Sequence, residues 1–116
     1  MIVIYHNPSC STSRNVLEMI RASGAKPFVI DYKKDGWTRG QLLGLFAAAG
    51  LTVREGLRTR GTTAEELGLT SADDETILAA MVADPILVER PFVCAPRGTR
   101  LCRPADRVQE LLGPAD

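Results

Sequence analysis

One cysteine near the start of the chain stands where a reactive thiol is expected. Cys10 follows the apolar residues 2–5 (IVIY) and lies within the polar segment 6–14 (HNPSCSTSR). A strand that turns directly into a helix leaves unpaired backbone N–H groups, and these favour a nearby negative charge. The position therefore predicts a thiolate with a lowered pKa and a nucleophilic role for Cys10. A buried structural thiol is the usual alternative for a single cysteine.

Three neighbours of Cys10 are candidates to support it. His6 is the one histidine of the chain, and it either stabilises the thiolate electrostatically or orients the loop. Ser13 takes the place of the second cysteine of a Cys-x-x-Cys dithiol, so a resolving thiol must come from elsewhere. We expect the Ser13 hydroxyl to donate a hydrogen bond to the thiolate. Arg14, in the first helical turn, is placed to reach the loop or a bound anion.

Arginines further along the chain suggest what the thiolate would meet. Eleven of the fourteen basic residues are arginine, and residues 90–105 contain four arginines and no acid. A tetrahedral oxyanion with several charges needs planar, permanently charged donors, which arginine supplies better than lysine. Arg58, Arg90 and Arg103 are the candidates. Each one taken singly is typical of a protein surface, and spacing alone does not bring them together.

The elements that must position these residues begin with a strand, a helix and a strand. Residues 2–5 and 27–32 predict strands, since both are rich in β-branched and aromatic residues. Between them a helix is expected from near Ser13, capped by a hydroxyl among residues 11–13 and ended by Gly24. A right-handed crossover makes the two strands parallel.

The middle of the chain predicts helices. Thr38 and Gln41 form the pattern of a capping box, and the helix they open is closed by Gly50. A third helix is expected to be capped by the pattern Ser71-x-x-Asp74 and to end before Pro85. Residues 37–83 thus predict an inserted helical block.

The chain ends with two strands and a helix. Residues 91–95 and 100–102 flank the turn 96–99 (PRGT) and predict a β-hairpin. Pro104 suits the first position of a last helix. The whole order is βαβ, helical block, ββα, which is an α/β fold of the thioredoxin-like kind. In such folds a proline at the start of the third strand, often cis, faces the active-site cysteine. Arg90-Pro91 stands at that point, with its isomer left open.

Composition sets bounds on the domain and its partners. A chain of 116 residues, 45% apolar and 24% charged, predicts one globular domain over residues 1–116. A formal net charge of zero favours neither nucleic acid nor an anionic membrane. Three cysteines without a signal peptide indicate free thiols in a reducing cytoplasm. No apolar run approaches the ~20 residues of a membrane span.

Two other chemistries fail on spacing. The Cys-x5-Arg loop of tyrosine phosphatases needs an arginine where this chain has Val16. A zinc site drawn from the one histidine and the cysteines Cys10, Cys94 and Cys102 would have irregular spacing, unlike the paired motifs of such sites. No metal is expected.

The same residues resemble a known family. His6, Cys10 and Arg14 match the His-x3-Cys-x3-Arg signature of the glutaredoxin-coupled arsenate reductases. The likeness covers nearly the whole chain, with matching segments at 4–21, 66–69, 85–91 and 98–104.

The resemblance implies a function in arsenic resistance. Cys10 would attack arsenate, while Arg58, Arg90 and Arg103 bind the oxyanion; Arg60 is the alternative to Arg58. Glutathione would act as co-substrate and glutaredoxin as the reducing partner, with no bound cofactor or metal, in the cytoplasm.

Two rival functions share this fold. One is a glutathione-dependent thiol reductase without arsenate activity, which would have little use for three arginines. The other is a non-catalytic regulator that contacts RNA polymerase and uses a Cys-x-x-Cys redox switch. Ser13 argues against that switch.

Overall fold

The computed structural model describes residues 1–113. The chain divides into two compact units: the first contains Met1–Tyr32 and the chain from Arg90 onward, and the second contains Lys33–Glu89. Each unit is described by itself. One domain over residues 1–116 stays a prediction.

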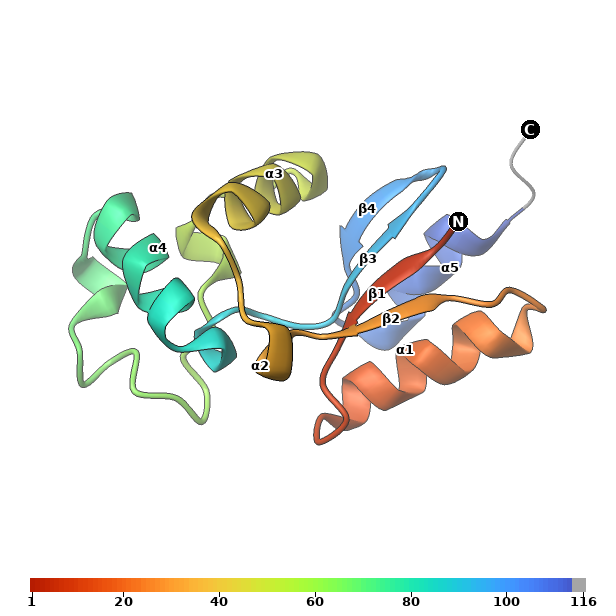
Figure 1. Cartoon of the computed structure of the whole chain (residues 1–116), viewed down its shortest axis with the longest axis horizontal. Coiled ribbons are helices and arrows are strands. Elements are labelled where there is room, and N and C mark those ends of the chain that lie inside the picture. The colour runs from red at the N-terminus through yellow and green to blue at the C-terminus, as the bar shows by residue number, and fades with distance from the viewer. Residues whose placement is uncertain (114–116) are drawn as a thin grey trace. The chain divides into compact units, whose positions relative to one another are not determined.

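A four-stranded sheet forms the centre of the first unit (Figure 1). Its strands are β1 (Val3–His6), β2 (Phe28–Asp31), β3 (Phe92–Ala95) and β4 (Gly98–Leu101), in the order β2-β1-β3-β4. β1 and β2 are parallel and are connected by α1 (Ser11–Ala22), whereas β1–β3 and β3–β4 are antiparallel. The predicted parallel pair and the predicted hairpin are both confirmed.

One face of this sheet carries the apolar core of the first unit. Ile4 of β1 and Val93 of β3 lie opposite each other in the register, so both side chains point to the same face. The apolar side of α1 packs there, together with η4 (Ala105–Val108) and α5 (Gln109–Leu112). The buried members of this cluster are Ile4, Val16, Leu17, Ile20, Val93, Cys102, Val108 and Leu111.

The start of α1 differs from the prediction. The helix begins at Ser11, and Cys10 itself is the N-cap residue, with no side-chain cap hydrogen bond. The predicted hydroxyl cap among residues 11–13 is therefore wrong, because these residues already lie in the first helical turn. Gly24 follows the helix with a φ of +89° and donates its N–H to the carbonyl of Arg21, as a residue just past a helix end should.

Two prolines flank the hairpin in cis. The peptide bonds Arg90–Pro91 and Arg103–Pro104 are both cis. Pro104 is the residue before η4 and not the first residue of a helix, so that prediction is wrong by one position.

The second unit contains the predicted helical block. Its main helices are α3 (Arg39–Ala49) and α4 (Asp74–Ala83), with shorter turns η1 (Arg54–Gly56), η2 (Leu69–Ser71) and η3 (Pro85–Leu87). A short helix, α2 (Tyr32–Asp35), begins at the boundary with the first unit. Within residues 1–113 no helix has the length and apolar character that crossing a membrane requires.

The caps of the two main helices have different outcomes. At α3 the capping box is confirmed, since Gln41 N–H donates to Thr38 Oγ1 (3.1 Å) and Thr38 N–H donates to Gln41 Oε1 (2.9 Å). At α4 the predicted cap Ser71 is wrong. Asp73 caps the helix and accepts from the N–H of Thr76 (2.8 Å). An aspartate is as good a cap as a serine, so the sequence alone did not decide between them.

A glycine in the second unit provides a test of its packing. A Cβ on Gly56 would lie 2.5 Å from Cε1 of the buried Phe46 ring, whereas a Cβ on Gly44, in α3, would meet nothing within 4 Å. We expect Gly56→Ala to lower the free energy of unfolding by about 1–3 kcal/mol through overpacking. Gly44→Ala should raise it by about 0.5–1 kcal/mol, because alanine favours a helix. Urea unfolding measures both, and equal effects would contradict the packing described here.

Candidate active site

Cys10 lies in the short connection between β1 and α1. Its own N–H donates to the carbonyl of Asn7 (3.0 Å), which closes a tight turn over residues 7–10, called here the Cys10 loop. The residue is mostly buried, with 9% of its surface exposed. Cys10 stands at the N-cap position of α1, and the backbone N–H of Ser13 in the first helical turn stabilises its thiolate.

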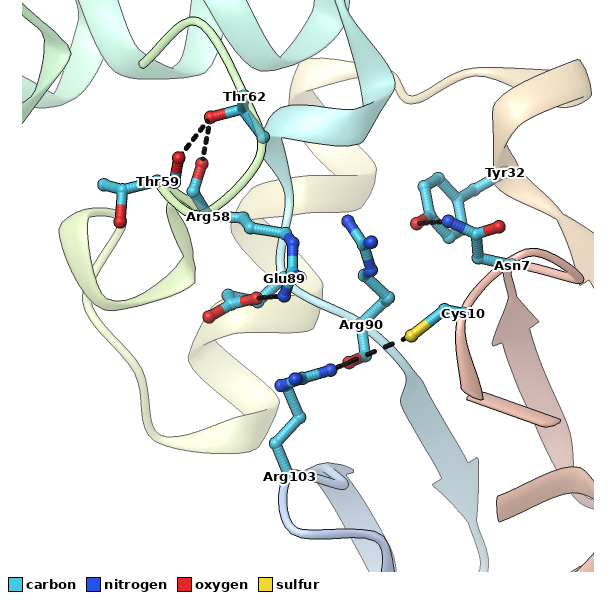
Figure 2. Close-up of polar contacts among 9 residues, drawn as sticks. All are labelled: Asn7, Cys10, Tyr32, Arg58, Thr59, Thr62, Glu89, Arg90 and Arg103. Atoms are coloured by element: carbon cyan, nitrogen blue, oxygen red, sulfur yellow. Dashed lines mark hydrogen bonds and ion pairs between the residues drawn. The ribbon is translucent and has the colours of Figure 1, made fainter. Parts of the chain in front are cut away.

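Two arginines of the first unit supply the remaining donors (Figure 2). Arg103 Nη1 lies 3.9 Å from Cys10 Sγ and also donates to the carbonyl oxygen of Arg90 (3.0 Å). The Arg90 guanidinium also stabilises the thiolate and contributes to the lowered pKa of Cys10. Two of the three predicted substrate arginines are thus brought to the thiol.

These donors decide the ionisation of Cys10. Burial by itself raises the pKa of a thiol, but the N–H of Ser13 and the guanidinium groups of Arg90 and Arg103 outweigh burial. Together they lower the pKa of Cys10 from 9.0 to about 7. A large fraction of Cys10 is therefore thiolate at neutral pH, as the position at a helix start predicted.

His6 and Ser13 form a buried pair behind the loop. His6 Nδ1 and Ser13 Oγ are 2.6 Å apart, and Ser13 Oγ also accepts from the N–H of Asn7 (3.0 Å). The expectation that the Ser13 hydroxyl donates to the thiolate is wrong, since the hydroxyl faces His6 and the backbone N–H serves the thiol. Burial lowers the pKa of His6, while Asp31 opposes this shift, so the ring is mainly neutral at pH 7. Of its two predicted roles, orientation of the loop fits a neutral ring better than electrostatic support.

Arg14 contacts the loop. Its Nη1 donates to the carbonyl of Pro8 (2.8 Å) from an exposed position on α1. This is the first of the two positions that the sequence allowed, the loop or a bound anion.

Arg58 belongs to the second unit. The strand-like segment around Leu57 pairs with Val88, with Arg58 N–H donating to the carbonyl of Leu87 (2.8 Å). This pairing sets Arg58 Nη1 2.9 Å from Glu89 Oε1, and only 12% of the Arg58 side chain is exposed (Figure 2). Arg60 is exposed. Arg58 is thus the more buried arginine of the two and is paired with Glu89, and its place beside Cys10 stays a prediction.

The other two cysteines lack these surroundings. Cys102 is fully buried, and burial raises its pKa to about 12. Cys94 is half-buried on β3, and all three cysteines are free. Within residues 1–113 no three His, Cys, Asp or Glu side chains gather as a metal site.

Three residues in contact with these groups were not predicted from the sequence. Asn7 hydrogen-bonds within the Cys10 loop and to the hydroxyl of Tyr32, and Glu89 pairs with Arg58. The Asn-Pro-Ser order is typical of a side-chain-closed turn and could have indicated Asn7. Tyr32 and Glu89 carry no local pattern that would single them out.

The chain matches known proteins over nearly its whole length. The sequence model of the ArsC family matches residues 5–111. The arsenate reductase ArsI2 of Synechocystis sp. is 60% identical over 114 residues, which are 97% of this chain and 81% of that protein. The arsenate reductase of Escherichia coli K12 is 49% identical over 113 residues, covering 96% and 80%.

A solved structure gives the same result for the fold. The arsenate reductase from Vibrio cholerae superposes with a TM-score of 0.88 and 36% identity, covering 95% of this chain and 96% of that one. The predicted thioredoxin-like α/β fold is confirmed.

The ionisation of Cys10 can be measured directly. We expect its alkylation by iodoacetamide to accelerate as the pH rises through about 7 and to level off above, because only the thiolate reacts. Arg90→Gln should move this midpoint upward by removing a positive donor, whereas Arg97→Gln, in the exposed hairpin turn, should not. Mass spectrometry of the Cys10 peptide reports the rate. A midpoint near the ordinary ~8.5 of a free thiol would contradict the site described here.

Proposed function

The chain belongs to the ArsC family, and from this membership and the geometry around Cys10 we propose that it is an arsenate reductase. Cys10 is the nucleophile, glutathione the co-substrate and glutaredoxin the final reductant. The observation that carries the proposal is the environment of the Cys10 sulfur, which is stabilised as a thiolate by the Ser13 N–H and by the guanidinium groups of Arg90 and Arg103. A nucleophilic thiolate surrounded by permanent positive charge suits attack on a multiply charged oxyanion.

The first step forms the bond between sulfur and arsenic. The Cys10 thiolate attacks arsenic while one arsenic–oxygen bond breaks, and the departing oxygen takes a proton and leaves as water. Arg90 and Arg103 face the region where negative charge gathers during this step. Their guanidinium groups stay charged at every relevant pH, so they bind the dianion without losing their protons.

The later steps take their electrons from two external thiols. The glutathione thiol replaces a second oxygen on arsenic, and that oxygen again leaves as water. The glutaredoxin thiolate then attacks the glutathione sulfur. The electron pair of the sulfur–arsenic bond stays on arsenic, which passes from As(V) to As(III), while the two external sulfurs become a mixed disulfide. Water displaces Cys10 from arsenic, which releases arsenite and restores the thiolate.

An external resolving thiol is supported by the environment of the internal ones. Cys102 is fully buried with a pKa raised to about 12, so it is a poor nucleophile, and Ser13 occupies the second dithiol position. We further propose that the reaction needs no bound cofactor and that the enzyme works in the reducing cytoplasm, where its three free cysteines persist.

The choice of reductant tests the function. We expect arsenite to form from arsenate with glutathione and glutaredoxin, and not with thioredoxin in place of both. Cys10→Ser should abolish arsenite formation, because serine is not ionised at neutral pH. Arsenite formation is followed by chromatographic separation of the two arsenic species.

Substitution of the other cysteines is the matched control for this experiment. Cys94→Ser and Cys102→Ala should each keep most of the activity. A double Cys94→Ser/Cys102→Ala variant that folds but makes no arsenite would replace the glutathione mechanism by an internal disulfide relay. Absence of arsenite from the unchanged chain with every reductant would overturn the proposed function.

The substrate arginines give a separate test. We expect Arg58→Gln to raise the KM for arsenate about tenfold or more, since a hydrogen bond from a charged group is worth about 1.5–3 kcal/mol. Arg60→Gln is the matched control, since it makes the same chemical change two positions away. It should leave the KM within about twofold, because Arg60 is exposed. Steady-state kinetics with phosphate as competitor gives both values. A larger effect of Arg60→Gln would transfer the substrate role to Arg60.

A further inference from the structure

Asn7 uses all of its polar groups to hold the Cys10 loop. Its carbonyl oxygen accepts from Cys10 N–H (3.0 Å), and its Oδ1 accepts from Ser9 N–H (2.9 Å). Its own N–H donates to Ser13 Oγ (3.0 Å), and its Nδ2 donates to the hydroxyl of Tyr32 (3.2 Å). Only 3% of the residue is exposed. One buried amide therefore connects the loop, the first turn of α1 and Tyr32, the residue that follows β2.

These contacts restrain the loop at three places: within the turn, at the start of α1 and at Tyr32. The bonds to Ser9 and Cys10 close the same turn twice, once through the side chain and once through the backbone. The bond to Ser13 ties the start of the turn to the helix whose N–H groups support the thiolate. Among the four Asn7 bonds, the bond to Tyr32 reaches a distant segment, 25 residues along the chain.

We propose that Asn7 and Tyr32 are positioning residues, which hold the Cys10 loop so that the sulfur faces the Ser13 N–H and the two guanidinium groups. As a statement about the reaction, this rests on the arsenate reductase function proposed above. The geometry in Figure 2 supports it, since the Asn7 side chain points at the Tyr32 hydroxyl and Cys10 follows directly on the same turn.

Burial of an amide and a phenol is tolerated only where both are hydrogen-bonded. Asn7 and Tyr32 are 3% and 1% exposed, so their polar groups lose their hydrogen bonds to water. The hydrogen bonds they make within the protein offset only part of this free-energy cost. Three of the four Asn7 contacts lie within the segment that carries the nucleophile, and a displacement of about 1 Å there costs on the order of a hundredfold in rate.

Two substitutions test the proposal. Asn7→Ala removes the side-chain contacts to Ser9 and Tyr32, and Tyr32→Phe removes only the hydroxyl. We expect both to slow the alkylation of Cys10 at pH 7, and Asn7→Ala to lower kcat for arsenate about tenfold with a smaller loss for Tyr32→Phe. The KM for arsenate should stay within about twofold, since the arginines are untouched. The double variant should be no slower than Asn7→Ala, because Asn7→Ala already removes the Asn7–Tyr32 hydrogen bond that Tyr32→Phe breaks.

Controls separate positioning from folding and from the function itself. Asn15→Ala, an exposed asparagine of α1, should change neither readout. If Asn7→Ala fails to fold, Tyr32→Phe still decides, because the ring remains. Unchanged alkylation and kcat in a folded Tyr32→Phe variant, or a rise in KM with constant kcat, would overturn the proposal. If the unchanged chain makes no arsenite, the proposed function fails, while alkylation still tests the positioning of the thiol.

Discussion

The negative charge on Cys10 exists near neutral pH because several donors meet at one mostly buried sulfur. Burial alone would raise the pKa of this thiol, as it does for Cys102, whose pKa reaches about 12 in the apolar core. The Ser13 N–H and the guanidinium groups of Arg90 and Arg103 reverse this effect and bring the pKa of Cys10 to about 7. Two thiols of one chain thus differ widely in nucleophilicity through their surroundings alone.

The sheet register of the first unit brings these donors together. Tyr5 of β1 lies opposite Phe92 of β3, so the chain that leaves β1 toward Cys10 passes the residues that precede Phe92. Phe92 in turn lies opposite Leu101 of β4, which places the residues before β3 next to those after β4. Arg90 and Arg103 are therefore neighbours although they are thirteen positions apart in the sequence. The hydrogen bond from Arg103 to the Arg90 carbonyl joins them directly.

Local patterns were sufficient for much of this arrangement and insufficient for its details. The parallel strands, the hairpin, the capping box at Thr38 and the position of Cys10 all follow from residue order, because each depends on neighbours a few positions apart. Helix starts in runs of polar residues were misplaced, since several side chains there could cap equally well. At α1 this moved Ser13 into the first turn, where its hydroxyl faces His6.

The contacts that no local pattern indicates are tertiary ones. Asn7 meets Tyr32 across 25 residues, and Glu89 meets Arg58 across 31. Such pairs depend on the completed sheet or on the pairing of Leu57 with Val88, so spacing along the chain carries no information about them. The same reason leaves the convergence of Arg58 with Cys10 as a prediction.

One arginine in each unit has a buried donor that is left unpaired. In the part of the chain described, the Nε atoms of Arg58 and Arg90 are buried and have no hydrogen-bond partner. A buried donor without an acceptor costs about 1–3 kcal/mol, a cost that an acceptor on a bound oxyanion would remove. Arsenate offers several charged oxygens, and so does phosphate, which has nearly the same shape and charge. Under the proposed function, hydrogen bonding to these arginines gives no preference between the two anions, and the selectivity lies in the sulfur, which reduces arsenic and not phosphorus.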